Sequence, residues 1–89
     1  MTGMTMSDPF TQAEHDAIIH MKPDEAALLR ALSNGVMPRD AGETLGIHWK
    51  RVEKLCYKWA DRGWYEYGVT ADLGWLTPKG IVAAQHLSQ

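Results

Sequence analysis

The sequence contains almost no cysteine and has no long apolar run. Cys56 is the only cysteine among 89 residues, so no disulfide can form within the chain, and a reducing, cytoplasmic compartment is expected. We expect Cys56 to be a small buried hydrophobic residue and not a reactive thiol. No stretch approaches the roughly 20 apolar residues of a membrane-spanning helix, and the N-terminus lacks a signal-peptide pattern. No membrane partner is therefore expected.

Motifs of the common enzyme and metal sites are missing as well. The four histidines show neither an HExxH pattern nor a zinc-ligand spacing with cysteine, and no Ser-His-Asp or phosphate-loop pattern occurs. The early acids, which begin segments with helical patterns, are expected to be first-turn and surface charges: Glu14, Asp16, Asp24 and Glu25. We therefore expect no enzyme, no cofactor and no bound metal.

A chain of 89 residues is long enough for one small domain with a single modest core. Four Trp, three Tyr and one Phe supply large side chains for that core. The first residues are rich in Met and polar residues, so we expect 1–10 to be a disordered lead and 11–89 to be the folded domain.

The net charge of −2 hides an uneven distribution along the chain. Residues 1–47 contain three basic and seven acidic residues, and residues 63–89 contain one basic and two acidic residues. Segment 48–62 instead has five basic and two acidic residues, so all the positive excess lies there. This asymmetry favours an anionic partner at that segment.

Segment 48–62 also has the pattern of an amphipathic helix. On a wheel with about 100° per residue, its apolar residues share one arc and its lysines point the other way. The apolar arc contains Val52, Leu55, Cys56 and Trp59, with His48 and Trp49 at its edges. The opposite face contains Lys50, Lys54, Tyr57, Lys58 and Asp61, with Arg51 and Glu53 on the flanks.

The residues just before this helix predict a tight turn from another helix. Gly46 can adopt a positive φ and suits the end of a helix. Ala41 and Gly42 are small enough for close packing between helices. Leu45 and Ile47 would form an apolar wedge with Val52 and Leu55.

The remaining segments predict helices at both ends and one hairpin. Thr11 and Glu14 form a capping-box pattern, Pro23 suits a first helical position, and Thr77-Pro78 suits another helix start. The first helix would bury Ile18 and Met21, the second its leucines, and the last Ile81, Val82, Ala84 and Leu87. The expected elements are helices at 11–22, 23–34, 38–45, 48–62 and 78–88, with a hairpin at 64–77.

This order and two motifs resemble the winged helix-turn-helix family, as found in small bacterial and phage regulators. One motif consists of a small residue in the helix before the turn, then Leu45-Gly46-Ile47 at the turn, then apolar residues six and nine positions after the glycine. The other is Gly74–Gly80, GWLTPKG, which is similar to the Leu-Thr-x-x-Gly junction that closes the wing. The resemblance covers about 23–87, and it implies a mainly α fold with a small β-hairpin.

The resemblance also implies sequence-specific binding to double-stranded DNA, with the helix at 48–62 in the major groove. Arg51 has the planar fork suited to guanine, while Lys54 and Lys58 suit phosphates. Trp49 would either pack or contact DNA, and His48 would either cap the helix partially or contact DNA. The contact candidates are His48, Trp49, Lys50, Arg51, Lys54, Tyr57 and Lys58.

Two departures from the family pattern keep another function open. The expected wing tip, 69–73, contains no cation, and His48 stands where Ser or Thr commonly caps the helix. One copy should bind DNA weakly, so we expect a homodimer formed through the N- and C-terminal helices. The alternative is a protein–protein interaction module within a larger complex, for example one from a phage. The aromatic residues of the hairpin would suit such an interface: Trp64, Tyr65, Tyr67 and Trp75.

Overall fold

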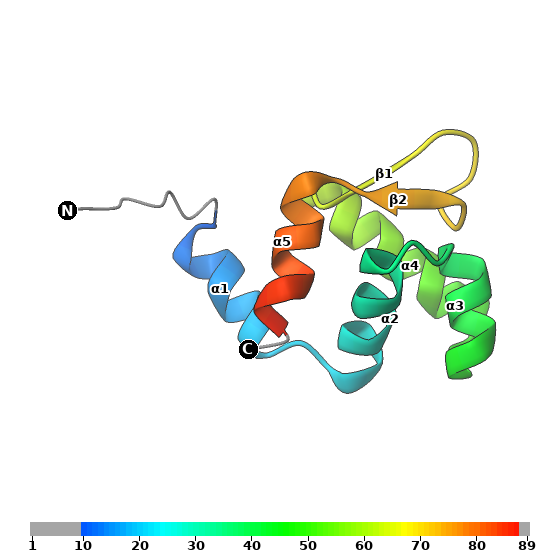
Figure 1. Ribbon diagram of the computed structural model, residues 1–89, viewed down its shortest axis with the longest axis horizontal. Coiled ribbons are helices and arrows are strands. Elements are labelled where there is room, and N and C mark those ends of the chain that lie inside the picture. The colour runs from blue at the N-terminus through cyan, green and yellow to red at the C-terminus, as the bar shows by residue number, and fades with distance from the viewer. Residues whose placement is uncertain (1–9, 88–89) are drawn as a thin grey trace.

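Five helices and a two-stranded antiparallel hairpin make up residues 10–87 of the computed structural model, the part of the chain that the structure describes (Figure 1). The sequence predicts this mainly helical composition with one hairpin. The helices are α1 (Gln12–Ile19), α2 (Pro23–Ser33), α3 (Pro38–Leu45), α4 (Trp49–Asp61) and α5 (Pro78–Leu87). The strands are β1 (Tyr65–Tyr67) and β2 (Gly74–Leu76).

Local capping signals set where the first two helices begin. Thr11 and Glu14 form the expected capping box: the Thr11 hydroxyl accepts from the Glu14 N–H at 3.2 Å, and a Glu14 carboxylate oxygen accepts from the Thr11 N–H at 3.1 Å. Helix α1 ends at Ile19, earlier than the expected 22, and Lys22 is extended as a residue before proline should be. Pro23 then occupies the first position of α2.

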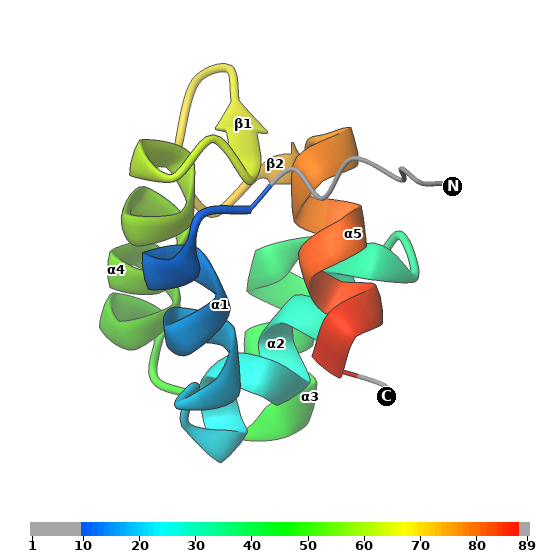
Figure 2. The same ribbon diagram turned by 90° about the vertical axis from the view of Figure 1, so that its left-hand side faces the viewer.

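The core lies around α2, which packs against α3 and α5. Figure 2 shows α4 and α5 on opposite sides of the molecule. Burial of each large apolar side chain contributes about 1.5–3 kcal/mol, which makes this cluster the main source of stability. Its members with essentially no exposed surface include Leu28 and Leu29 of α2, Leu55, Cys56 and Trp59 of α4, and Trp64.

Three apolar residues differ from the burial that the sequence predicts for them. Leu45, expected in the wedge between α3 and α4, is 43% exposed because Gly42 and Ile47 make the close contacts there. Ile81 is 40% exposed because α5 turns small residues, including Ala83 and Ala84, toward the core. Phe10, the last residue of the expected disordered lead, is buried, while residues 1–9 of that lead lie outside the described residues.

Phe10 is buried among aromatic rings that join α1 to the rest of the molecule. Its ring meets Trp64 edge-on with 6.0 Å between centroids, and His86 of α5 at 5.2 Å. Edge-to-face pairs of this kind stabilise packing beyond the area they bury. The folded domain therefore includes the residue just before Thr11.

The two ends of the hairpin are fastened together by Thr77. Its hydroxyl donates to the Gly63 carbonyl at 2.7 Å, and its N–H donates to the Trp64 carbonyl at 2.9 Å. The same hydroxyl accepts from the Gly80 N–H at 3.1 Å and so caps α5, as the Thr77-Pro78 pattern predicts. A side chain at Gly80 would collide with the Trp64 carbonyl, so α5 lies directly against the base of the hairpin.

Strand register turns one face of the hairpin inward and one outward. Tyr65 pairs with Leu76, and both side chains are buried. Glu66 pairs with Trp75 on the opposite face, and Trp75 is 55% exposed. The aromatic hairpin residues are therefore divided between the core, which holds Trp64 and Tyr65, and the surface.

Candidate nucleic-acid interface

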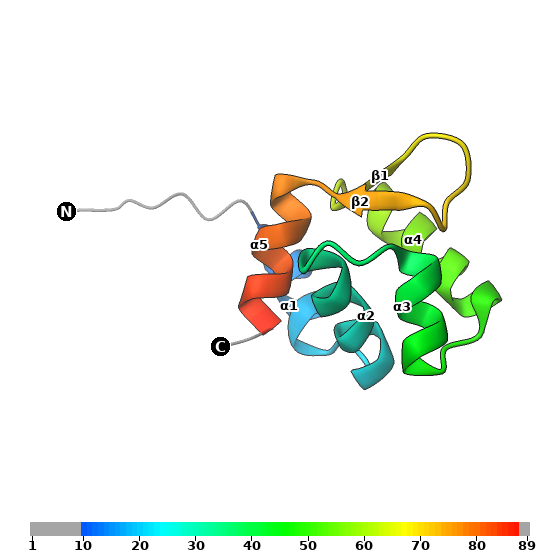
Figure 3. The same ribbon diagram turned by 45° about the vertical axis from the view of Figure 1, so that its right-hand side comes forward.

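The turn between α3 and α4 places the start of α4 at one edge of the molecule (Figure 3). Gly46 ends α3 with φ +73°, the left-handed conformation that the sequence predicts. The Ile47 N–H closes the turn by donating to the Gly42 carbonyl at 2.8 Å. A Cβ added at Gly42 would lie 2.6 Å from Val52 Cγ2, so the two helices meet as closely as the small residue allows.

His48 is the N-cap of α4. Its Nδ1 accepts from the Lys50 backbone N–H at 3.1 Å, which satisfies one of the free donors at the helix start. The imidazole thus caps the helix, one of the two roles that the sequence predicts for His48. The ring also stacks on Trp49 with 5.8 Å between centroids, and Trp49 is 62% exposed.

Two lysines and a tyrosine continue this exposed surface along α4. Lys50, Lys54 and Tyr57 are exposed, and neither lysine has an ion-pair partner within residues 10–87. Lys50 Nζ lies 5.6 Å from the centroid of the Trp49 ring, within the range of a cation–π contact. We call the following set the open face of α4: His48, Trp49, Lys50, Lys54 and Tyr57.

The other two cations predicted to contact DNA are held by α2. Arg51 Nε lies 3.1 Å from Asp24 Oδ2, and Arg51 Nη2 lies 3.3 Å from Glu25 Oε1. Lys58 Nζ lies 3.2 Å from Glu25 Oε2. The hydrogen bonds from Arg51 lower the pKa of Asp24, and the same contacts raise the pKa of Arg51.

The sequence predicts Glu25 as a surface charge, and this prediction is wrong. Its side chain is only 6% exposed, and it bridges Arg51 and Lys58. The Arg51 fork is therefore occupied within the molecule, while the Lys58 side chain remains 48% exposed. Because α2 neutralises two of the five cations of segment 48–62, the positive charge presented outward is smaller than the sequence predicts.

The loop between the strands is docked on the start of α3. Arg39 Nε donates to Asp72 Oδ2 at 2.8 Å, which lowers the pKa of Asp72, and the Arg39 N–H donates to the Asp72 carbonyl. The buried Tyr65 hydroxyl of β1 donates to the Ala71 carbonyl of the loop at 2.6 Å. Val69, at the tip, is 94% exposed. The loop thus exposes the apolar Val69 to solvent, and it contains no cation.

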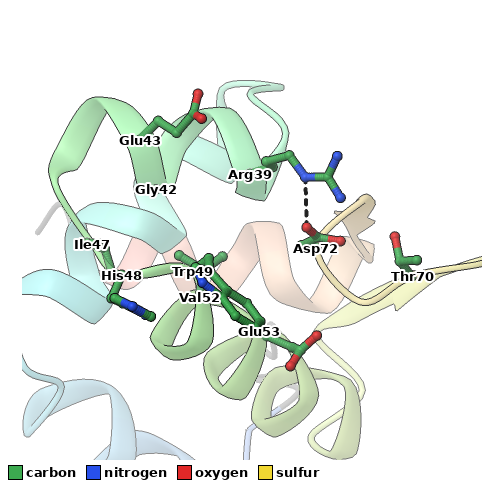
Figure 4. A pocket seen from close by; sticks show the side chains of 10 residues that line it. All are labelled: Arg39, Gly42, Glu43, Ile47, His48, Trp49, Val52, Glu53, Thr70 and Asp72. Carbon is green, nitrogen blue, oxygen red and sulfur yellow. Dashed lines mark hydrogen bonds and ion pairs between the residues drawn. The ribbon is translucent and has the colours of Figure 1, made fainter.

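A hollow of about 660 Å³ lies between α3, the start of α4 and this loop (Figure 4). It adjoins the open face of α4, with which it shares His48 and Trp49. The Arg39–Asp72 pair stands at the side formed by the loop. The residues that line it are Arg39, Gly42, Glu43, Ile47, His48, Trp49, Val52, Glu53, Thr70 and Asp72.

Within residues 10–87, no group of three or more His, Cys, Asp or Glu side chains could hold a metal ion, and no helix is long and apolar enough to cross a membrane. Cys56 is buried, and desolvation raises the pKa of its thiol to about 11, so little of it is the nucleophilic thiolate at neutral pH. Comparisons with known protein families, curated proteins and solved structures found no match to this chain.

Proposed function

We propose that this chain is a winged helix-turn-helix domain, not an enzyme, and that it binds double-stranded DNA as a small transcriptional regulator. Support comes from the order of the elements, the Gly46 turn and the hairpin docked beside α3. The observation that carries the proposal is the open face of α4, with Lys50 and Lys54 unpaired within residues 10–87 at the start of a helix that projects at an edge.

The proposed contacts follow from which side chains are free. Lys50 and Lys54 meet phosphates or guanine edges, while His48 and Trp49 lie nearest the bases. Arg51 and Lys58 set the angle of α4 on α2, because Asp24 and Glu25 already bind them. With two free lysines the log–log salt slope of binding is about −2 per chain, which is weak for specific recognition.

Weak binding by one copy requires a dimer on two half-sites. The terminal helices are the proposed dimer surface, since Ile19 of α1 and Ile81 of α5 are 71% and 40% exposed. Light scattering after size exclusion at high micromolar concentration should give twice the chain mass. A monomer under these conditions would remove the dimer from the proposal.

Fluorescence anisotropy with a labelled random-sequence duplex at low salt tests DNA binding. We expect the wild type to bind the duplex in a salt-sensitive way. The double variant Lys50→Gln with Lys54→Gln should lose nearly all of this affinity, and its log–log salt slope should be smaller in magnitude by about 2. The control is Lys22→Gln with Asn34→Asp, which lowers the net charge equally at exposed positions outside α1, α4 and α5. The control should keep most of the affinity.

A protein–protein interaction module is the second candidate, and two observations favour it. The cations Arg51 and Lys58 are neutralised within the molecule, and the exposed Trp49 and Trp75 are aromatic residues of the kind enriched at protein interfaces. If the lysine variant and its control bind the duplex equally, the open face does not contact phosphates. The interaction module would then replace DNA binding as the proposal.

A further inference from the structure

The hollow between α3, α4 and the hairpin loop combines an apolar floor with an aromatic wall. Gly42, Ile47 and Val52 line it where the two helices meet, and the exposed Trp49 ring stands beside them. Its volume of about 660 Å³ falls within the range of small-molecule sites, roughly 300–1,000 Å³. The shape and the floor suit a ligand with a compact apolar body.

Charge in the hollow has one sign once the internal ion pair is set aside. Arg39 and Asp72 neutralise each other at 2.8 Å. Glu43 of α3 and Glu53 of α4 also line the hollow, and within residues 10–87 neither carboxylate has an ion-pair partner. The remaining charge is therefore negative, and it comes from two different helices.

Lys50, at the start of α4, makes no ion pair with either carboxylate. Its Nζ lies 5.6 Å from the centroid of the Trp49 ring, and the residue does not line the hollow. The aromatic ring thus already accepts a cation. The charge of a ligand is therefore assigned to Glu43 and Glu53, and the ring serves as an apolar wall.

We infer that this hollow is a binding site for a small organic cation with an apolar body, such as an arylalkylammonium. The apolar body packs on Ile47, Val52 and the Trp49 ring. Glu43 and Glu53 stand on opposite sides of the hollow (Figure 4), so the ammonium group donates charge-assisted hydrogen bonds to one carboxylate while the other adds to the negative potential. A neutral molecule of the same shape leaves the carboxylates without a partner. A polyamine satisfies the carboxylates but leaves the apolar floor uncovered.

NMR of the ¹⁵N-labelled protein with 4-phenylbutylammonium as the probe tests the site directly. The indole N–H signal of Trp49, assigned by its loss in Trp49→Phe, should shift and saturate, while those of the buried Trp59 and Trp64 stay in place. Neutral 4-phenyl-1-butanol and the polyamine spermidine should each bind at least about tenfold more weakly. Equal affinity for the alcohol, or no shift of Trp49, overturns the inference.

A pair of variants isolates the carboxylates. Glu43→Gln with Glu53→Gln should lose at least about tenfold in affinity for 4-phenylbutylammonium. Asp61→Asn with Glu66→Gln removes the same charge outside the hollow and should keep the wild-type affinity. Since all four positions are on the surface or half-buried, circular dichroism should show both variants folded. Wild-type affinity in the Glu43 and Glu53 variant overturns the inference.

The hollow shares His48 and Trp49 with the open face of α4, so a bound cation should oppose DNA binding, a consequence that rests on the proposed function. In the anisotropy assay 4-phenylbutylammonium should lower the duplex affinity of the wild type more than that of the Glu43 and Glu53 variant. Because the NMR titration contains no DNA, the two ideas fail separately. If 4-phenylbutylammonium binds but duplex binding does not depend on Lys50 and Lys54, the cation site stands and the proposed DNA-binding function is wrong. If the duplex binds but the Trp49 signal does not shift, the DNA-binding function stands and the cation site is wrong.

Discussion

Gly42 lies where α3 packs closely against Val52 of α4. A β-carbon there would lie 2.6 Å from Val52 Cγ2, a distance that real side chains do not adopt. Val52 is buried and β-branched, so it has little freedom to turn away. The absence of one methyl group thus sets the angle at which α4 leaves the turn.

We predict that Gly42→Ala lowers the free energy of unfolding by about 1–3 kcal/mol, because the added methyl overpacks the seam between the helices. Urea unfolding followed by circular dichroism measures the change. Gly68→Ala is the matched control, since no atom lies within 4 Å of the added carbon and its φ is not positive. The control should change the stability by less than about 0.5 kcal/mol. Equal stability of the two variants would show that Val52 yields at no cost.

At the scale of the elements, α4 is fastened to α2 by the Glu25 carboxylate. Glu25 is buried, and its two oxygens bind Arg51 and Lys58, which stand two turns apart on α4. A carboxylate buried in this way is costly unless both oxygens are paired. The pairing therefore fixes which way α4 rotates, and so which of its cations face outward.

We predict that Glu25→Gln lowers the free energy of unfolding by about 1–3 kcal/mol, because it breaks charged hydrogen bonds to two cations that remain partly solvated. Glu66→Gln, which removes an exposed carboxylate on β1, is the control and should have little effect. Thermal and urea unfolding of both variants provide the comparison. If Glu25→Gln behaves like Glu66→Gln, the bridge does not hold α4.

Features encoded by neighbouring residues are the ones that the sequence predicts. The Thr11 capping box, the left-handed Gly46 and the Thr77 cap each depend on a few adjacent positions. The burial of one side of α4 follows from its helical period. These short-range signals give the elements and the position of α4, but not the partners of its outward side chains.

Contacts between distant segments could not be predicted from the sequence. Glu25 looks like an ordinary first-turn acid, and only packing brings it to Arg51, 26 positions away. The hollow depends on Asp72 meeting Arg39 across 33 positions, and on which faces of α3 and α4 remain uncovered. The helical period of 78–88 predicts Ile81 in the core, but the base of the hairpin packs against small residues of α5 such as Gly80, and Ile81 is exposed. That requirement cannot be read from the period alone.

Across the whole molecule, ion pairs link elements that are far apart in the sequence. Glu14 joins α1 to Lys79 of α5, and Asp24 joins α2 to Arg51 of α4. Asp72 joins the hairpin loop to α3. Hydrogen bonds and cations lower the pKa of all three carboxyl groups: the backbone of Thr11 for Glu14, and an arginine for each aspartate.

We predict that acid destabilises the fold through these groups. A carboxyl group whose pKa is lower in the folded chain contributes fully above its unfolded pKa, about 4, and loses that contribution as the pH falls through its folded pKa. Urea unfolding at pH 7, 5, 4 and 3 should show stability declining below about pH 4. Asp24→Asn with Asp72→Asn should be less stable at pH 7 and show a shallower decline. Parallel curves for the variant and the wild type would assign the acid sensitivity to other groups.

Thr77 has a further consequence for how far the hairpin can reach. Because it ties Gly63 and Trp64 to the start of α5, the two stems of the hairpin are already held together before the tip is reached. Lengthening a loop whose ends are pinned adds only a slowly growing entropic cost. Residues inserted between Gly68 and the exposed Val69 would therefore extend the tip while the core stays as it is. This junction is where the same scaffold can acquire a longer or more basic arm without being redesigned.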